Sequence, residues 1–328
     1  MIGFDMTLLA LLMVAGVALD WLLGEVSRWH PLVGFGRYVQ WLEGHLNRQP
    51  GSYARGALAW LLAVLPLVAL SVLITILLAR QSFWLAAAWH VVLLYFCIGL
   101  RSLRDHVMPI AKALKSGDLA AARNLTGRIV SRDTTQSQET DLAKAAVESL
   151  LENGNDAVFG TLFWFALAGG PGALLFRLAN TLDAMWGYRT PRFLAFGCVA
   201  ARIDDGLNWI PARLTAWSYA LLGNWRQART CWRTQAPAWS SPNAGPVMSS
   251  GAGALGLALG GAAIYDGEVE ERPPLGVGRD AVADDIVRAW KLVSRTAMLW
   301  LTVMLTISML MTMFYATYVS LTMGGTHA

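Results

Sequence analysis

Charged residues are scarce in this chain, and that scarcity decides its broad class. Asp, Glu, Lys and Arg make up 15% of the 328 residues, whereas 55% are hydrophobic. A soluble globular domain carries about a quarter charged residues. The chain also has no GxxxxGK[ST] motif, which excludes a P-loop nucleotide site. The composition therefore predicts an integral membrane protein.

Cysteine is equally sparse. Cys97, Cys198 and Cys231 are odd in number, far apart and without CxxC spacing. This pattern excludes a disulfide framework and a cysteine metal site, so we expect free thiols that are mostly buried. Lysine and arginine are absent before Arg28 and after Arg295. Because no basic segment precedes the first apolar run, a cleaved signal peptide is not expected.

Four stretches are long and apolar enough to cross a bilayer, which needs about 20 residues. They are residues 6–23, 57–79, 83–100 and 297–319. Basic residues gather between the first two and after Leu100, so both of those regions are predicted to be cytoplasmic, with both termini outside. The predicted fold class is an all-α, polytopic integral membrane protein with about four transmembrane helices plus cytoplasmic, buried or re-entrant helices.

The whole chain, 1–328, is expected to form a single membrane domain. Residues 101–156 are predicted to be a cytoplasmic helical insert. Residues 157–295 are predicted to be buried or re-entrant helices that carry site loops, because GGPG interrupts the apolar run and irregular backbone at membrane depth must be packed inside protein. No sheet is predicted.

Capping residues place two helices in the insert. Asp118 is the predicted N-cap of a helix that runs through Val130. Thr135 with Gln138 resembles a capping box, which would open an amphipathic helix from about residue 137 to Glu152.

Three carboxylates stand one helical turn apart in ESLLENGND, residues 148–156. Glu148, Glu152 and Asp156 share one helix face, although residues 153–155 are expected to end the helix. Carboxylate and amide oxygens suit Mg²⁺, which usually keeps waters and bridges to phosphate. A solvated acidic face with Lys144 pairing Glu148 explains the motif equally well on its own.

A second acidic pair lies in ARIDDGLNWIPAR, residues 201–213. Asp204 and Asp205 precede an apolar run, and Asn208 follows four residues after Asp204. Such a pair can chelate a metal, or it can be a helix N-cap followed by an acid that the helix dipole favours. Two clusters of acids and amides near membrane boundaries make a purely structural role less convincing for both.

Two more polar segments need partners in so apolar a chain. NTLDAMWGYR, residues 180–189, contains Asn180 and Asp183 and ends at Arg189. In GRIVSRDT, Arg128 and Arg132 lie four apart on the predicted helix and could clamp a phosphate or carboxylate. A helix C-terminus, which favours cations, explains the two arginines almost as well.

The glycine-rich segment SSGAGALGLALGG, residues 249–261, contains a formal GxGxxG. We reject a dinucleotide site there because no predicted strand precedes it and no βαβ pattern surrounds it. Gly256 and Gly260 instead form a GxxxG, which predicts close helix packing.

Several of these motifs occur together with others in a fixed order. They are ALDWLLGE…HPLVGFGR (18–37), GRIVSRDT (127–134), AAVESLLENGND (145–156), NTLDAMWGYR (180–189), ARIDDGLNWIPARL (201–214), SPNAGPVMSSGAGALGLALGG (241–261) and ERPPLGVGRD (271–280). In this order the chain resembles the adenosylcobinamide-phosphate synthase family, the CobD/CbiB membrane proteins of cobalamin biosynthesis. The resemblance covers roughly residues 8–295.

The resemblance implies an ATP-dependent acid–amine ligase in a bacterial inner (plasma) membrane, with its active site facing the cytoplasm. The family joins aminopropanol, expected as its O-phosphate, to the free propionate of adenosylcobyric acid and so forms adenosylcobinamide (phosphate). The expected cofactors are ATP, as co-substrate, and Mg²⁺. The expected partners are the two substrates and membrane lipid, with no nucleic acid. A homo-oligomer and contact with other cobalamin-biosynthesis enzymes are compatible with this function.

The same resemblance gives the candidate residues roles, taken together with the chemistry. Metal ligands are expected among Glu148, Glu152, Asp156, Asp204 and Asp205. Catalytic roles are expected for Asp183, which could orient the amine or accept its proton, and for Glu148 and Arg132. ATP or substrate phosphate is expected to be held by Arg128, Arg189, Arg213, Asn180, Ser241 and Asn243.

Other functions are weaker interpretations of the same motifs. An AmpE-like membrane signalling protein without catalysis should lack most of the acids and the SPNAG loop. A Mg²⁺-dependent membrane transferase acting on a lipid diphosphate usually has its acids inside a bundle of complete spans. A transporter is disfavoured by the long polar region between residues 101 and 156.

Overall fold

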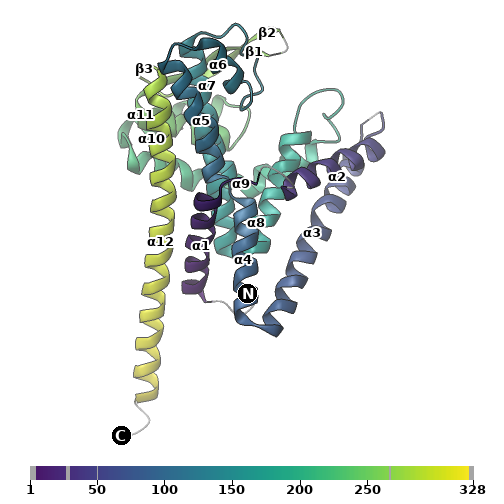
Figure 1. Cartoon of the computed structure of the whole chain (residues 1–328), viewed down its shortest axis with the longest axis vertical. Coiled ribbons are helices and arrows are strands. Elements are labelled where there is room, and N and C mark those ends of the chain that lie inside the picture. Colours follow the sequence, from purple (N-terminus) through teal and green to yellow (C-terminus); the bar gives the residue numbers. More distant parts are fainter. Residues whose placement is uncertain (1–4, 27–29, 50, 266, 325–328) are drawn as a thin grey trace.

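Helices form nearly all of the described structure, as the sequence predicts. The computed structural model describes residues 5–26, 30–49, 51–265 and 267–324, with side chains through Tyr315. The helices are α1 (Met6–Leu23), α2 (Pro31–Leu46), α3 (Tyr53–Gln81), α4 (Phe83–Cys97), α5 (Leu100–Lys115), α6 (Leu119–Thr126), α7 (Glu139–Gly154), α8 (Gly160–Trp186), α9 (Cys198–Leu222), α10 (Trp225–Gln235), α11 (Ala244–Leu255) and α12 (Ala283–Gly324). Figure 1 shows α1, α3, α4 and the lower part of α12 extending from one end of the molecule.

Five helical segments are long and apolar enough to cross a membrane. They are Met6–Leu23, Tyr53–Gln81, Phe83–Lys115, Glu139–Trp186 and Ala283–Tyr315. Four of them overlap the four predicted spans. A tight turn joins α3 to α4, since the Ser82 hydroxyl accepts the Trp84 N–H and caps α4. The chain is therefore an all-α polytopic membrane protein. Met1 and Ala328, on which the predicted topology of the termini depends, lie outside the described residues.

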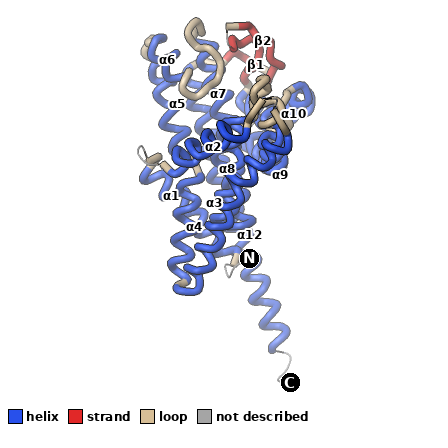
Figure 2. The backbone as a smooth tube through the Cα atoms, turned by 90° about the vertical axis from the view of Figure 1, so that its right-hand side faces the viewer, coloured by secondary structure: helices blue, strands red, loops and turns tan. Residues whose placement is uncertain are grey.

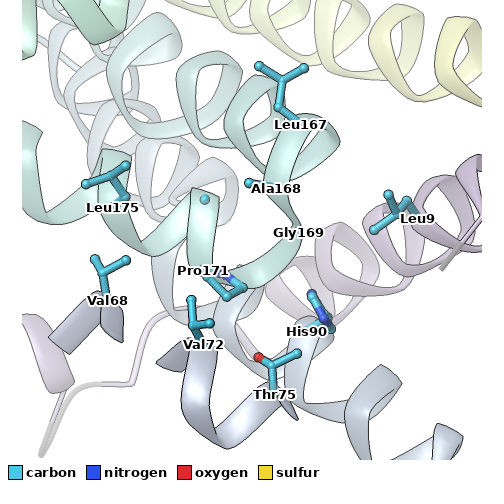
Figure 3. Close-up of a pocket in the computed structure, with 11 residues that line it drawn as sticks. Leu9, Val68, Val72, Thr75, His90, Leu167, Ala168, Gly169, Pro171 and Leu175 are labelled. Atoms are coloured by element: carbon cyan, nitrogen blue, oxygen red, sulfur yellow. The ribbon is translucent and has the colours of Figure 1, made fainter. Parts of the chain in front are cut away.

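Helix α8 reverses its direction at Gly169 and forms a helical hairpin. Gly169 has φ +64°, a conformation that glycine adopts without a Cβ penalty. A Cβ on Gly160 would lie 2.1 Å from Phe176 Cζ, so the two arms pack directly against each other. His90 fixes the tip, because its Nδ1 accepts the Gly170 N–H at 2.8 Å (Figure 3). Such a hairpin is the geometry expected of a re-entrant segment, and it places Gly160 at the start of α8 beside Phe176 on the second arm.

Helices α5, α6, α7, α10 and α11 gather at the opposite end of the molecule with a small sheet (Figures 1 and 2). The strands β1 (Leu257–Tyr265), β2 (Glu268–Leu275) and β3 (Arg279–Asp280) have the order β2-β1-β3. Strand β1 is antiparallel to β2 and parallel to β3.

The prediction that the chain has no sheet is wrong. Gly256 has φ +68° and ends α11, and Gly260 and Gly261 have φ of +74° and +79°. A helix does not accept these angles, so Gly256 and Gly260 form a helix cap and a strand irregularity instead of a helix-packing GxxxG.

Helix α6 is shorter than predicted. Asp118 caps it as expected, with its carboxylate accepting the Ala121 N–H at 2.9 Å. The helix ends at Thr126, before Arg128, because the chain turns away to meet the sheet, where the Asp133 N–H donates to Ile264 O at 2.8 Å. The prediction that Arg128 and Arg132 share a helix is therefore wrong.

The predicted capping residues and the predicted end of α7 are also wrong. The capping box uses Gln138 and Asp141 in place of Thr135 and Gln138, so the helix begins at Glu139. Its other end does not stop at the ENGND motif. The helix continues through a π-helical turn, η1 (Asn155–Phe159), directly into α8. The widened turn carries Asp156 toward α9.

Candidate active site

Three segments that are far apart in the sequence bring a buried cluster of acids and amides together. Asn208 of α9 joins two carboxylates, because its Nδ2 donates to Asp156 Oδ1 at 3.3 Å and to Asp204 Oδ2 at 3.2 Å. Asn155 Nδ2 donates to Asn208 Oδ1 at 2.8 Å. From the second arm of α8, Asn180 Nδ2 donates to Asp204 Oδ1 at 3.4 Å. We call these residues, with Asp183, the acid–amide cluster.

No ion pair at contact distance neutralises the cluster within the described residues, although Arg177 lies close enough to act on Asp156 through its charge. The ion pairs of the described chain include neither Asp156 nor Asp204. Burial raises the pKa of Asp204 well above its ordinary value, and the charges of Asp156 and Asp183 raise it further. Burial also raises the pKa of Asp205, against the opposing effect of the nearby arginines. Such acids without an ion pair are typical of functional sites.

The donor set of the cluster fits a magnesium ion. Among the described residues, no three His, Cys, Asp or Glu side chains are grouped closely enough to hold a metal ion by themselves. Mg²⁺ rarely uses such a cage, since it keeps several waters and binds through one or two carboxylates plus substrate phosphate. Asp156 and Asp204, bridged by one amide, supply that pair of carboxylates.

A polar cavity of about 310 Å³, here called the sheet cavity, lies between α7, β2 and the loop before α11. Glu148 forms its charged wall. Its Oε2 accepts Arg132 Nη2 at 2.6 Å and Arg272 Nη1 at 2.8 Å, and its Oε1 accepts the Gly260 N–H at 2.8 Å. Glu152 lines the same cavity and makes no ion pair within the described chain.

This geometry separates the carboxylates of ESLLENGND. Glu148 is 4% exposed and both of its oxygens are occupied, whereas Glu152 faces the cavity. The alternative pairing of Lys144 with Glu148 is wrong, because Lys144 Nζ contacts Asp280 Oδ1 at 2.7 Å. The catalytic and metal-binding roles of Glu148 stay predictions.

The SPNAG loop is tied to α9 next to this cavity. Arg213 Nη1 donates to Asn243 Oδ1 at 2.6 Å, and Asn243 Nδ2 donates to Asp205 O at 2.9 Å. Ser241 lines the sheet cavity, and its hydroxyl accepts the Ala244 N–H that opens α11. Arg213 and Asn243 therefore hold the loop in place, whereas Ser241 remains available to a ligand.

A second polar cavity, of about 450 Å³, lies beside the second arm of α8 and is here called the hairpin cavity. Arg177, Asn180 and Thr181 line it from α8, and Asp20 and Glu25 line it from the end of α1. Asn153 lines both cavities. Asn153 is thus a wall that the two cavities share, and Asn180 connects the hairpin cavity to the acid–amide cluster.

Two predicted residues lie apart from these features. Arg128 and Arg189 are exposed, and neither lines either cavity. Two cationic residues of the cavities escaped prediction. Arg177 carried a signal, since it is the lone ionisable residue in the apolar run ALLFRLAN. The sequence around Arg272 gave no such signal, because its partner Glu148 is 124 residues away in the chain.

Comparison with known proteins assigns the chain to a family. A family model described as CobD/Cbib protein matches residues 13–293. The chain belongs to the CobD/Cbib family. A relative from Stutzerimonas stutzeri, named cobalamin biosynthesis protein CobD, is 56% identical over 294 residues, which cover 89% of this chain and 95% of the relative.

Further relatives of the same name have lower sequence identity to this chain. The CobD of Chromobacterium violaceum is 51% identical over 89% of this chain and 94% of its own length. The CobD of Rhodobacter capsulatus is 39% identical over 87% of this chain and 93% of its own length. No solved structure matches. Membership of the CobD/Cbib family gives the chain a role in cobalamin biosynthesis.

Proposed function

We propose that this CobD/Cbib protein is an ATP-dependent ligase that forms an amide between aminopropanol O-phosphate and the free propionate of adenosylcobyric acid. The observation that carries the proposal is the convergence of Asp156, Asp204 and Asn208, which Asn180 connects to one of two neighbouring polar cavities. An amide ligase needs room for two reactants that meet, and the two cavities share Asn153 as a common wall.

The reaction requires activation of the carboxylate, which is a poor acyl donor. In the proposed sequence a propionate oxygen attacks the γ-phosphorus of ATP, the bond from that phosphorus to the β-phosphate oxygen breaks, and ADP leaves. The amine nitrogen of aminopropanol O-phosphate then attacks the acyl carbon. A C–N bond forms, the acyl C–O bond breaks and inorganic phosphate leaves with the electron pair. The amine proton passes to a basic group of the site.

The residues of the site would contribute mainly by positioning and charge. Glu152 and Ser241 face the sheet cavity, where Arg132 and Arg272 provide positive charge beside Glu148. Asp183, half-buried near Asp204 and Asp156, is the candidate acceptor for the amine proton. Asp183 can accept this proton only while its carboxylate is ionised.

Mg²⁺ would be held by Asp156 and Asp204, and when bound it would neutralise phosphate charge. Asn208 keeps these two carboxylates at one place without adding charge, since its amide donates to both. Asn155 in turn fixes Asn208, and the Thr215 hydroxyl donates to Asn155 Oδ1 at 2.9 Å. The protein thereby preorganises the pair before a ligand arrives.

The direct test is product formation by the purified full-length protein. Adenosylcobyric acid, aminopropanol O-phosphate, ATP and Mg²⁺ are supplied, and mass spectrometry follows the amide product and ADP. We expect one ADP for each amide formed, and no product without ATP. Folded protein that makes no product with either aminopropanol or its phosphate would refute the proposed function.

A further inference from the structure

Arg177 is a half-buried cation that makes no ion pair at contact distance within the described residues, although Asp156 and Glu25 lie close enough to act on its charge. It lies on the second arm of α8 and lines the hairpin cavity. Its Nε is buried and meets no hydrogen-bond acceptor in the described structure. A buried guanidinium N–H without an acceptor costs free energy, so its presence at a cavity wall indicates an anionic ligand.

Two carboxylates also line the hairpin cavity. Asp20 Oδ2 accepts the Arg101 N–H at 2.8 Å, and Glu25 Oε2 accepts the Ser102 hydroxyl. These two hydrogen bonds use one oxygen of each carboxylate, Asp20 Oδ2 and Glu25 Oε2, and leave Asp20 Oδ1 and Glu25 Oε1 out. The cavity therefore presents one cation and two anions to the same space of about 450 Å³.

We propose that the hairpin cavity binds the amine donor of the reaction, a small amino-alcohol phosphate. Its phosphate contacts Arg177, and its ammonium group lies toward Asp20 and Glu25. The identity of this donor rests on the proposed function, whereas the site itself rests on the arrangement of charges. A nucleotide triphosphate fits the arrangement less well, because its several negative charges would lie beside two carboxylates.

This assignment gives each cavity one reactant. The amine approaches from the hairpin cavity, and the activated carboxylate approaches from the sheet cavity across Asn153. Asn153 is held on α7 because its Nδ2 donates to Ser149 O at 2.8 Å. Arg177 is thus a substrate-binding residue that acts on the donor phosphate and sets the preference for the phosphorylated amine.

Binding measurements test the site without requiring turnover. Full-length protein in nanodiscs is titrated calorimetrically with 1-amino-2-propanol O-phosphate, free 1-amino-2-propanol, inorganic phosphate and ATP, in the absence of corrinoid. Arg177→Gln should lower the affinity for the amino-alcohol phosphate about 10- to 100-fold, and it should also lower the affinity for inorganic phosphate. Free aminopropanol should bind this variant as it binds the wild type.

Glu25→Gln is the complementary variant, and its exposed position leaves folding undisturbed. It should weaken binding of both amines and leave inorganic phosphate unchanged. Arg80→Gln, at the far end of α3, is the matched control and should bind every probe normally. Should Arg177→Gln misfold, Glu25→Gln still tests the site, because it removes one of the two anions expected to hold the ammonium group.

Two results would overturn the proposal. One is unchanged affinity for the amino-alcohol phosphate in Arg177→Gln. The other is a loss confined to ATP, which would make the cavity a nucleotide site. Failure of the proposed function looks different: donor binding would depend on Arg177 and Glu25 as stated, while the wild-type protein would form no amide product.

Discussion

Glu148 and Glu152 show how two acids one helical turn apart acquire different roles. Their spacing predicts equivalent positions on one face of a helix, and the structure does place both at the sheet cavity. Glu148 is nevertheless enclosed by Arg132 and Arg272, which sequence spacing cannot reveal because the second arginine comes from a distant strand. Glu152 keeps a carboxylate that faces the cavity.

Replacement of Glu148 tests its structural contribution. Glu148→Ala should lower the free energy of unfolding by about 3–5 kcal/mol, because it leaves two buried arginines without their shared partner. Thermal unfolding of the detergent-solubilised protein measures the change. Glu270→Ala on the exposed face of β2 is the control and should be close to neutral. Equal stability of the two variants would show that the Glu148 ion pairs do not support the fold.

Replacement of Asp204, in contrast to replacement of Glu148, should raise the stability of the fold. Because its pKa is raised in the fold, the protonated form is favoured there. That contribution is complete below the ordinary pKa of aspartate and is lost as pH rises through the raised value. Asp204→Asn should therefore be more stable than wild type at pH 8 without Mg²⁺, with a smaller difference at pH 4.

The same substitution should lower amide formation about 100-fold, since it removes a proposed metal ligand. Unfolding curves at the two pH values and steady-state rates measure both effects. A variant that is less stable at pH 8, or one that turns over like the wild type, would contradict the account of Asp204.

At the scale of elements, the break in α8 could be predicted from the sequence, but the side chains that it brings together could not. GGPG marks a break in an apolar segment, and the break occurs at Gly169. The reversal places Asp156 and Asn180 at the same end of the hairpin, where both reach α9. The sequence contains no sign of that pairing, because it depends on the angle of one glycine and on the packing of His90.

Gly169→Ala tests the hairpin. A Cβ at this position would lie 2.4 Å from the His90 ring and would require a left-handed backbone, so we expect a loss of at least about 1–2 kcal/mol in stability and a fall in activity. Gly44→Ala, with no atom within 4 Å of its Cβ, is the control and should be neutral or slightly stabilising. Thermal unfolding compares them, and equal behaviour would refute the role of Gly169.

The sheet and the ends of α6 and α7 were mispredicted for one physical reason. Glycines between 256 and 261 adopt positive φ, and residues near Asp133 bond to β1, so tertiary contacts outweigh local helix propensity. The π-turn at Asn155–Phe159 is a further example, since residues that usually end a helix here continue it.

At the scale of the whole molecule, composition and hydropathy were sufficient for the fold class. The length of the apolar segments identified the candidate spans, and the order of the motifs identified the family. The candidate site was only half predictable: Asp204, Glu152 and Asn180 were identified from local patterns. Arg177 and Arg272 required the fold, because one lies in an apolar arm and the other pairs across 124 residues.

The predicted topology can be tested at the C-terminus. Since no lysine or arginine follows Arg295, the end of α12 should face the periplasm. An alkaline phosphatase fused after Ala328 should be active, and a fluorescent protein that matures only in the cytoplasm should be dark. The reverse pattern would require a different number of spans.

The central claim is that ATP activates a corrinoid carboxylate for attack by an amine at this site. Transfer of oxygen-18 tests it most directly. Adenosylcobyric acid labelled in its free propionate should give one labelled oxygen in inorganic phosphate for each amide formed by the wild-type protein, and Asp204→Asn should show little transfer. Amide formation without label in the phosphate, or no amide at all, would contradict the account.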